Sequence, residues 1–168
     1  MATIKEQLNT VFTKITAGTV TREEGSMLLS DLVSRDAAGT LAELESLIEN
    51  PPQNVQRKTV FHTMVLARNK AYIPLIGKGL DSQDEEQATV AAEELSKFHT
   101  EEAEKVLNEH LAAETYNTRK VSAAALALGC GANGVRMLRE HILECTLALY
   151  CETSTEALLQ AGPAGLVA

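Results

Sequence analysis

Three segments that recur with a 31-residue period decide the fold: TVFHTMVLAR at 59–68, VAAEELSKFH at 90–99 and VSAAALALGC at 121–130. Across Val55–Leu143, a shift by one such period superimposes the apolar positions without a gap. The aligned positions are Val60, Ala91 and Ser122; Met64, Leu95 and Leu126; Ala67, Phe98 and Gly129; Ile76, Leu107 and Leu138; and Leu80, Leu111 and Ile142. A gapless period in the range of about 20 to 50 residues is typical of stacked repeats.

Each 31-residue unit predicts two helices joined by a short turn. The first helices are expected at residues 53–68, 83–98 and 116–129, and the second helices at 70–80, 101–113 and 134–151. A single helix pair cannot bury its apolar faces alone, so neighbouring pairs stack. The sequence therefore predicts an all-α, right-handed superhelix of about five helix pairs, with Leu95 and Leu126 in its core.

The region before the repeats predicts three more helices. Apolar residues at helical spacing indicate a helix over 3–16, and Thr21 and Glu24 form a capping box that opens a helix ending near Arg35. In that helix we expect four residues to point inward: Met27, Leu28, Leu32 and Val33. A turn at Ala38-Gly39-Thr40 then precedes a helix that ends at Asn50-Pro51-Pro52, because a residue before proline avoids the helical conformation.

The repeats and the C-terminal region also contain residues that are typical of helix ends. Capping boxes are expected at Ser82–Glu85 and Thr153–Glu156, and Thr100 is expected to cap the helix over 101–113. The glycine-rich segment Gly129–Gly134 indicates a turn, and Thr153 opens a C-terminal capping helix over 154–161. No segment has the pattern of a β-strand and no long linker divides the chain. We therefore expect one domain over residues 1–168, with N-terminal helices at 3–50 and clear repeats at 53–145.

Composition narrows the classes of function. Hydrophobic residues make up 45% of the 168 residues, and the net charge is −8. This balance argues against general binding to nucleic acid or to an anionic membrane, both of which require basic surfaces. No apolar run approaches the roughly 20 residues that span a bilayer, and the N-terminus lacks an apolar leader. The expected location is the cytoplasm.

The cysteines fit that location. Cys130, Cys145 and Cys151 form an odd, sparse set, which favours reduced thiols over a disulfide framework. Because Cys145 and Cys151 are expected on one helix, six positions apart, they would lie about 120° out of register around it. Cys130 lies in the glycine-rich turn, where we expect it to be exposed.

The repeats resemble those of a known family. Ser122–Gly129 with Arg119 before it, and Ala91–Leu95, resemble the first helix of HEAT-like (armadillo-type) repeats. Arg57 and Arg119, two repeat periods apart, resemble the basic residue that many such repeats carry, although Ala88 stands at this position in the middle unit. Pro74-Leu75 resembles the start of the second helix. The resemblance implies an α-solenoid binding scaffold whose concave face is lined by second helices, here within 70–80, 101–113 and 134–145.

Charge is distributed unevenly along the repeats. Residues 51–80 hold five basic and no acidic side chains, whereas residues 81–114 hold eleven acidic and two basic side chains. One interpretation is an ordinary solvated surface with ion pairs between units. The other is a bipolar surface that orients a charged partner. On the second interpretation the partner-binding residues are Lys70, Lys78, Glu101, Glu102, Glu104 and Glu109.

Two histidines occupy equivalent repeat positions. His110 and His141 each follow a glutamate and lie one repeat period apart, so they can converge on neighbouring helices. A metal site there is the alternative to two partly buried structural histidines. Among HEAT-like enzymes, deoxyhypusine hydroxylase binds iron through His-Glu pairs, but here the order is reversed and only two pairs occur. We expect no metal and no cofactor.

These features favour a non-catalytic scaffold or adaptor that binds another protein, since no catalytic constellation stands out. The alternative is a HEAT-like lyase or chromophore-attachment factor, as some phycobilin lyases share such repeats. That function would need a tetrapyrrole-sized pocket with polar or acidic groups. Nucleic-acid binding, as in HEAT-like alkylpurine DNA glycosylases, is disfavoured by the acidic centre and the absence of tryptophan. The oligomeric state is left open by the sequence.

Overall fold

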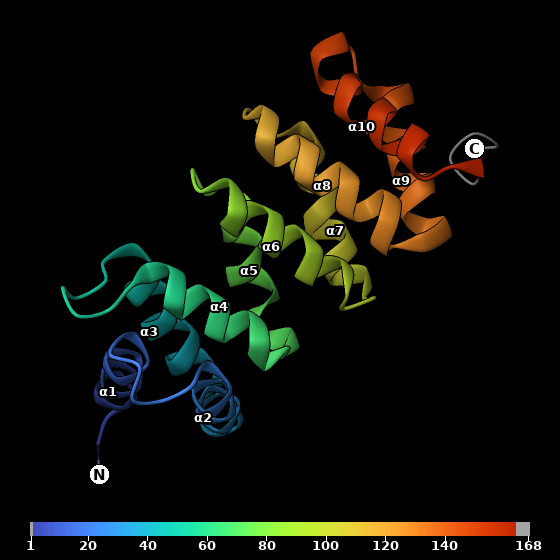
Figure 1. Ribbon diagram of the computed structural model, residues 1–168. Coiled ribbons are helices and arrows are strands. Elements are labelled where there is room, and N and C mark those ends of the chain that lie inside the picture. Colours follow the sequence, from blue (N-terminus) through green and yellow to red (C-terminus); the bar gives the residue numbers. More distant parts are fainter. Residues whose placement is uncertain (1, 164–168) are drawn as a thin grey trace. The chain divides into compact units, whose positions relative to one another are not determined.

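The structure, a computed structural model, describes residues 2–163, and every regular element in that range is helical (Figure 1). The prediction of an all-α protein is confirmed. The described range contains ten α-helices and two 3-10 helices: α1 (Ile4–Thr16), α2 (Arg22–Arg35), α3 (Ala37–Glu49), α4 (Arg57–Ala67), η1 (Lys70–Tyr72), α5 (Ile73–Gly79), α6 (Glu85–Ser96), α7 (Glu101–Glu109), η2 (His110–Ala112), α8 (Tyr116–Gly129), α9 (Gly131–Glu144) and α10 (Ala148–Gln160).

The chain divides into two compact parts, Met1–Leu75 and Ile76–Ala168, called here the N-terminal part and the C-terminal part. The boundary falls inside α5. The prediction of one domain over 1–168 stays a prediction, and its ends, residue 1 and residues 164–168, lie outside the described residues.

In the N-terminal part, four helices pack on one another. The α2 helix packs against α4, and α3 contacts α1, α2 and α4. Gly25 of α2 sits where an added Cβ would lie 2.6 Å from Ile15 Cδ1 and 3.1 Å from Thr63 Cγ2. A larger residue here would require the Ile15 and Thr63 side chains to shift, so glycine suits this close approach of the three helices. The fully buried side chains include Leu8, Phe12, Leu29, Leu44, Val60 and Met64.

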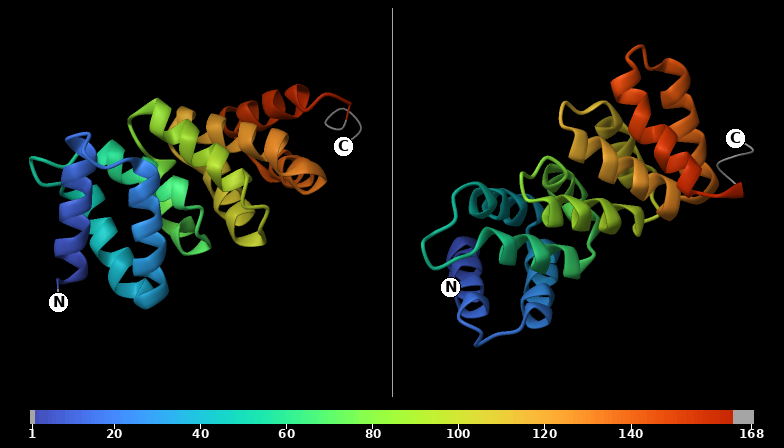
Figure 2. Two further views of the ribbon diagram at one scale, coloured as in Figure 1. Left: turned by 60° about the horizontal axis from the view of Figure 1, so that its bottom comes forward. Right: turned by 45° about the horizontal axis from the view of Figure 1, so that its top comes forward.

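In the C-terminal part, helices pack mostly with their sequence neighbours. The α8 helix packs between α6 and α10, and Figures 1 and 2 show these three helices following one another. The α7 and α9 helices each pack on the helix before them, α6 and α8 respectively. Several apolar positions that recur from unit to unit form the core as predicted, since the following side chains are fully buried: Leu95, Leu107, Leu111, Leu126 and Leu138.

Several helix ends match their sequence signals. The Thr21 hydroxyl accepts from the Glu24 amide while the Glu24 carboxylate accepts from the Thr21 amide, which completes the predicted capping box. Thr100 caps α7 through the Ala103 amide. The predicted helix at 116–129 is α8 itself.

Two predicted capping boxes are wrong. The α6 helix is capped by Asp84, whose carboxylate accepts from the Glu86 and Gln87 amides, while the Ser82 hydroxyl accepts only from the Asp84 amide. Aspartate is as good a cap as serine and lies two positions closer to the apolar pattern. Thr153 lies inside α10 and is buried, so its box with Glu156 does not form.

Other predicted boundaries also need correction. The turn expected at residues 38–40 lies at Asp36, which caps α3 through the Gly39 amide. The helix expected at 134–151 is divided into α9 and α10, and the turn before α9 shortens to Cys130. The C-terminal helix expected at 154–161 therefore begins at Ala148.

Two further expectations concern the repeats and the helix before them. The first helix of the repeats, expected at 53–68, is the shorter α4, and the helix expected at 70–80 is η1 followed by α5. Met27, expected to point inward, is 66% exposed, because Leu29 takes the buried position on α2.

Candidate functional site

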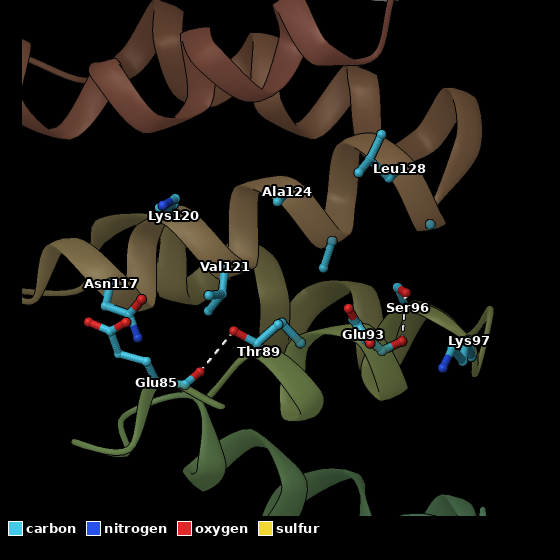
Figure 3. A pocket seen from close by; sticks show the side chains of 13 residues that line it. Glu85, Thr89, Glu93, Ser96, Lys97, Asn117, Lys120, Val121, Ala124 and Leu128 are labelled. Atoms are coloured by element: carbon cyan, nitrogen blue, oxygen red, sulfur yellow. Dashed lines mark hydrogen bonds between the residues drawn. The ribbon is translucent and has the colours of Figure 1, made fainter. Parts of the chain in front are cut away.

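A groove of about 540 Å³ runs between α6 and α8 in the C-terminal part (Figure 3). Glu85 and Asn117, near the starts of α6 and α8, lie together at one end, and Ser96 and Leu128, near the helix ends, lie toward the other. The two helices therefore run in the same direction along the groove. Its lining residues are Glu85, Thr89, Ala92, Glu93, Ser96, Lys97, Asn117, Lys120, Val121, Ala124, Ala125, Leu128 and Gly129.

The floor of the groove is apolar. Ala92 and Ala125 are buried and Val121 is half-buried. Alanine side chains are short, so two adjacent helices leave space above them that larger residues would fill. The α8 rim continues this surface through Ala124 to Leu128, which is 69% exposed. The floor and Leu128 therefore form one apolar surface that is open to solvent.

The α6 rim is polar. Glu85, Thr89, Glu93 and Lys97 follow one another at every fourth position, and they line the groove from one end of α6 to the other. The Lys97 ammonium pairs with the Glu94 carboxylate at 2.7 Å, so its charge is locally compensated.

Three charged groups at the groove stay uncompensated. Within residues 2–163, no hydrogen bond or ion pair engages the carboxylates of Glu85 and Glu93 or the ammonium of Lys120. The α6 rim thus carries two unpaired acids, and the α8 rim carries one unpaired base.

Gly129 brings the end of α8 close to α6. A Cβ at this position would overlap Oγ and Cβ of Ser96, so a larger residue would separate the helices. The Ser96 hydroxyl donates to the Glu93 carbonyl at 2.8 Å, which keeps it satisfied without a ligand. The groove is therefore closed by helix contact at one end, while at the other end Nδ2 of Asn117 is buried without a partner among the described residues.

Sequence reasoning missed this groove. The run Ala123-Ala124-Ala125 indicated close helix packing, and Leu128 stood in the same apolar pattern. The structure gives these residues different environments: Ala123 is fully buried, while Ala124 and Leu128 line the groove. Ala124 and Leu128 lie four positions apart on the same face of α8, and this spacing is the sequence signal that could have indicated the groove.

The residues predicted to bind a partner lie on three elements. Lys70 is in η1 of the N-terminal part, and Lys78 is near the end of α5 in the C-terminal part. Glu101 and Glu102 are exposed in the first turn of α7, where they also stabilise the helix dipole.

Two acids later in α7 have protein partners. The half-buried Glu104 carboxylate accepts a hydrogen bond from Nδ2 of Asn133 on α9, and Oδ1 of Asn133 accepts one from the Arg136 guanidinium. Glu109 is exposed and lies 3.8 Å from Lys105. Glu104 therefore holds α7 to α9, while Glu109 faces solvent.

The two repeat-related histidines have different partners. Nδ1 of His110 donates to the Val106 carbonyl at 2.7 Å, and its Nε2 lies 3.5 Å from the Asp81 carboxylate. Nδ1 of His141 lies 3.0 Å from the buried Ser154 hydroxyl. Burial lowers the pKa of His141, and the Glu144 carboxylate opposes that shift. The described residues include no group of three or more His, Cys, Asp or Glu side chains that could hold a metal ion.

Arg119 and Arg57, which resemble the basic residue of HEAT-like repeats, hydrogen-bond to backbone carbonyls that precede their helices. The Arg119 side chain is 1% exposed and donates to the carbonyls of Ala113 and Glu114 at 2.7 and 2.8 Å. Its guanidinium lies 4.9 Å from the centre of the Tyr150 ring, which adds a cation–π contact. Arg57 donates to the Glu49 carbonyl at 3.0 Å. Both arginines tie the start of their helix to preceding backbone.

The expectations about cysteine are wrong. Cys145 and Cys151 form a disulfide with a Cα–Cα distance of 6.1 Å. They were expected on one helix, but the chain leaves α9 at Glu144 and enters α10 at Ala148, which brings the two residues together. Cys130, expected to be exposed, is buried; burial and the nearby Glu104 carboxylate raise the pKa of its thiol to about 11.

A comparison with protein-family models gave no match, and a comparison with curated proteins gave none either. None of the helices within residues 2–163 combines the length and the apolar composition that crossing a membrane requires. Candidate functions therefore depend on the geometry of the chain itself.

Proposed function

We propose that this chain is a non-catalytic scaffold or adaptor that binds a segment of another protein in the groove between α6 and α8. The observation that carries this proposal is the apolar floor of the groove, continued by the exposed Leu128. An exposed apolar groove between two helices is a common receptor for a partner segment. Burial of the floor and of Leu128 supplies the free energy of binding.

The proposal includes a HEAT-like solenoid as the architecture. The sequential packing of α6 to α10 and the burial of the recurring apolar positions support it. It also keeps the acidic face of α7, with Lys78 of the same part, as a second surface for a protein partner. The exposure of Glu101, Glu102 and Glu109 supports that part. The proposal assigns the chain to the cytoplasm, with no cofactor, nucleic acid or membrane.

The test is capture of partners by the purified chain from its host, followed by mass spectrometry. Ala124→Arg places a long charged side chain on the α8 rim, where Ala124 is half-buried, and should remove the specific partners. Ala132→Arg is the matched control, because Ala132 is exposed on α9 and does not line the groove. Equal capture by both variants and the wild type would rule out the groove as the site.

The groove volume favours a second candidate function, a lyase or chromophore-attachment factor. About 540 Å³ lies within the range of small-molecule sites, and Glu85 and Glu93 provide acidic groups. A linear tetrapyrrole titrated into the protein should then show a shift in its visible absorbance that Ala124→Arg removes. An unchanged absorbance spectrum would leave protein binding as the function of the groove.

A further inference from the structure

The dimensions of the groove match a short helix. Its lining extends from Glu85 to Lys97 on one side and from Asn117 to Gly129 on the other. At about 1.5 Å per residue, such a length accepts roughly three turns of a guest helix. Because α6 and α8 run in the same direction, the floor is a continuous trough that a ridge of apolar side chains can fill.

The two rims differ in chemistry. The α8 rim is apolar from Ala124 to Leu128, and Lys120 is the charged residue near the Asn117 end. The α6 rim is polar, with unpaired carboxylates at Glu85 and Glu93, which lie about 12 Å apart along the helix. A guest lying between the rims therefore meets two negative charges on one edge and one positive charge on the other.

We propose that the occupant of the groove is an amphipathic helix of a partner protein, with basic side chains along the edge that faces α6 and an acidic side chain opposite Lys120. This inference rests on the proposed function and names its partner class. Basic residues seven or eight positions apart in the guest reach both Glu85 and Glu93. Charge complementarity of this kind fixes the register of the guest and speeds its association.

The experiment uses three synthetic helical peptides, each long enough for the roughly three turns that the groove accepts, and all with the same apolar ridge. The edge meant for α6 carries lysines in the first, glutamines in the second and glutamates in the third. Fluorescence anisotropy against the full chain should show the lysine peptide binding about fivefold more tightly than the glutamine peptide, and the glutamate peptide most weakly. Added salt should reduce these differences.

Two protein variants locate the effect. Glu93→Lys should weaken binding of the lysine peptide and improve binding of the glutamate peptide. Glu156→Lys changes the net charge equally on α10, outside the groove, and should leave the ranking unchanged. If both variants shift the ranking alike, net charge rather than the α6 rim selects the peptide, and the inference is overturned.

The remaining outcomes separate this inference from the proposed function. If all three peptides bind equally well and Ala124→Arg abolishes their binding, the groove remains a partner site but the guest has no basic edge. If no peptide binds while capture of a native partner still depends on Ala124, the occupant is not a helix. Self-association of the chain in sedimentation, lost in Ala124→Arg, would make the occupant a second copy and overturn the inference. Peptide binding insensitive to Ala124→Arg would contradict both proposals.

Discussion

At the residue scale, the leucines at recurring repeat positions are buried, whereas a leucine close by on the same helix is exposed. Leu95 and Leu126 are fully buried, whereas Leu128, two positions after Leu126 on the same helix, is 69% exposed. Neighbouring leucines on one helix therefore have opposite roles, because two steps along an α-helix turn the side chain by about 200°.

We expect Leu95→Ala to lower the free energy of unfolding by about 2 to 5 kcal/mol, since it leaves a cavity in the core. Leu128→Ala, the matched control, should change it by less than about 0.5 kcal/mol because that side chain is largely in solvent. Chemical denaturation followed by circular dichroism measures both. Equal effects would show that the assigned core positions are wrong.

The His141 ring makes stability depend on pH. Burial holds its pKa in the folded chain below the ordinary value of 6.5, so the unfolded chain takes up a proton first as the pH falls. The free energy of unfolding therefore keeps the full contribution of the neutral His141 ring above about pH 6.5, the ordinary pKa of histidine. It loses that contribution as the pH falls from there through the lowered pKa of the folded chain. His141→Asn keeps a polar atom near Ser154 but cannot titrate.

Denaturation curves at about pH 7.5 and about pH 5.5 should show a larger loss of stability for the wild type than for His141→Asn. The comparison between the two proteins cancels the contribution of carboxylates that titrate in the same range. The same loss in both would indicate that His141 is solvated and titrates alike in the folded and unfolded chain.

At the element scale, the connection between α9 and α10 is where the structure departs most from the sequence pattern. The disulfide of Cys145 and Cys151 closes this connection, and Tyr150 beside it lies over the buried Arg119. Protein purified without reductant and denatured should then react with a thiol reagent at Cys130 alone. Three reactive thiols would mean that Cys145 and Cys151 are reduced in the purified protein and would contradict the prediction.

Sequence periodicity predicted where helices occur but less well where they end. The repeat predicted the burial of Leu95 and Leu126 because core positions tolerate little besides apolar side chains. The Thr153–Glu156 pattern was misleading, because the same residue spacing also fits the interior of a helix. In the structure the helix has already begun at Ala148, five residues before Thr153.

The groove could not be predicted for a related reason. Its volume depends on how far apart α6 and α8 lie, which is set by contacts such as Gly129 against Ser96. Likewise, the acids of α7 were correctly placed on one helix, but the sequence could not show that Asn133 binds Glu104 while Glu109 stays in solvent. Those differences arise from packing between helices.

At the scale of the whole molecule, charge limits the choice of partners. The net charge is −8, and the acids are concentrated between residues 81 and 114. Phosphate backbones are repelled by such a surface, so a gel-shift assay with duplex DNA at low salt should show no complex. Tight binding that disappears with added salt would mean that the basic residues of 51–80 act independently of the acidic segment.

The last prediction decides between the two candidate surfaces for a protein partner, the groove and the acidic face of α7. Glu109→Lys is the appropriate reversal on α7, because Glu109 is exposed and beyond the first turn. Glu104→Lys is not, because it would leave Asn133 without its acceptor and cost about 1 to 3 kcal/mol of stability.

With the groove as the binding site, Ala124→Arg should abolish partner capture, while Glu109→Lys should leave both thermal stability and equilibrium capture nearly unchanged. If the negative field of α7 steers a basic partner, Glu109→Lys should also slow association at low salt, and added salt should remove the difference. Stopped-flow or biolayer measurements of the association rate separate these effects from the dissociation rate. The reverse result, in which Glu109→Lys abolishes capture at moderate salt and Ala124→Arg does not, would place the partner on α7 and leave the groove without a role in binding.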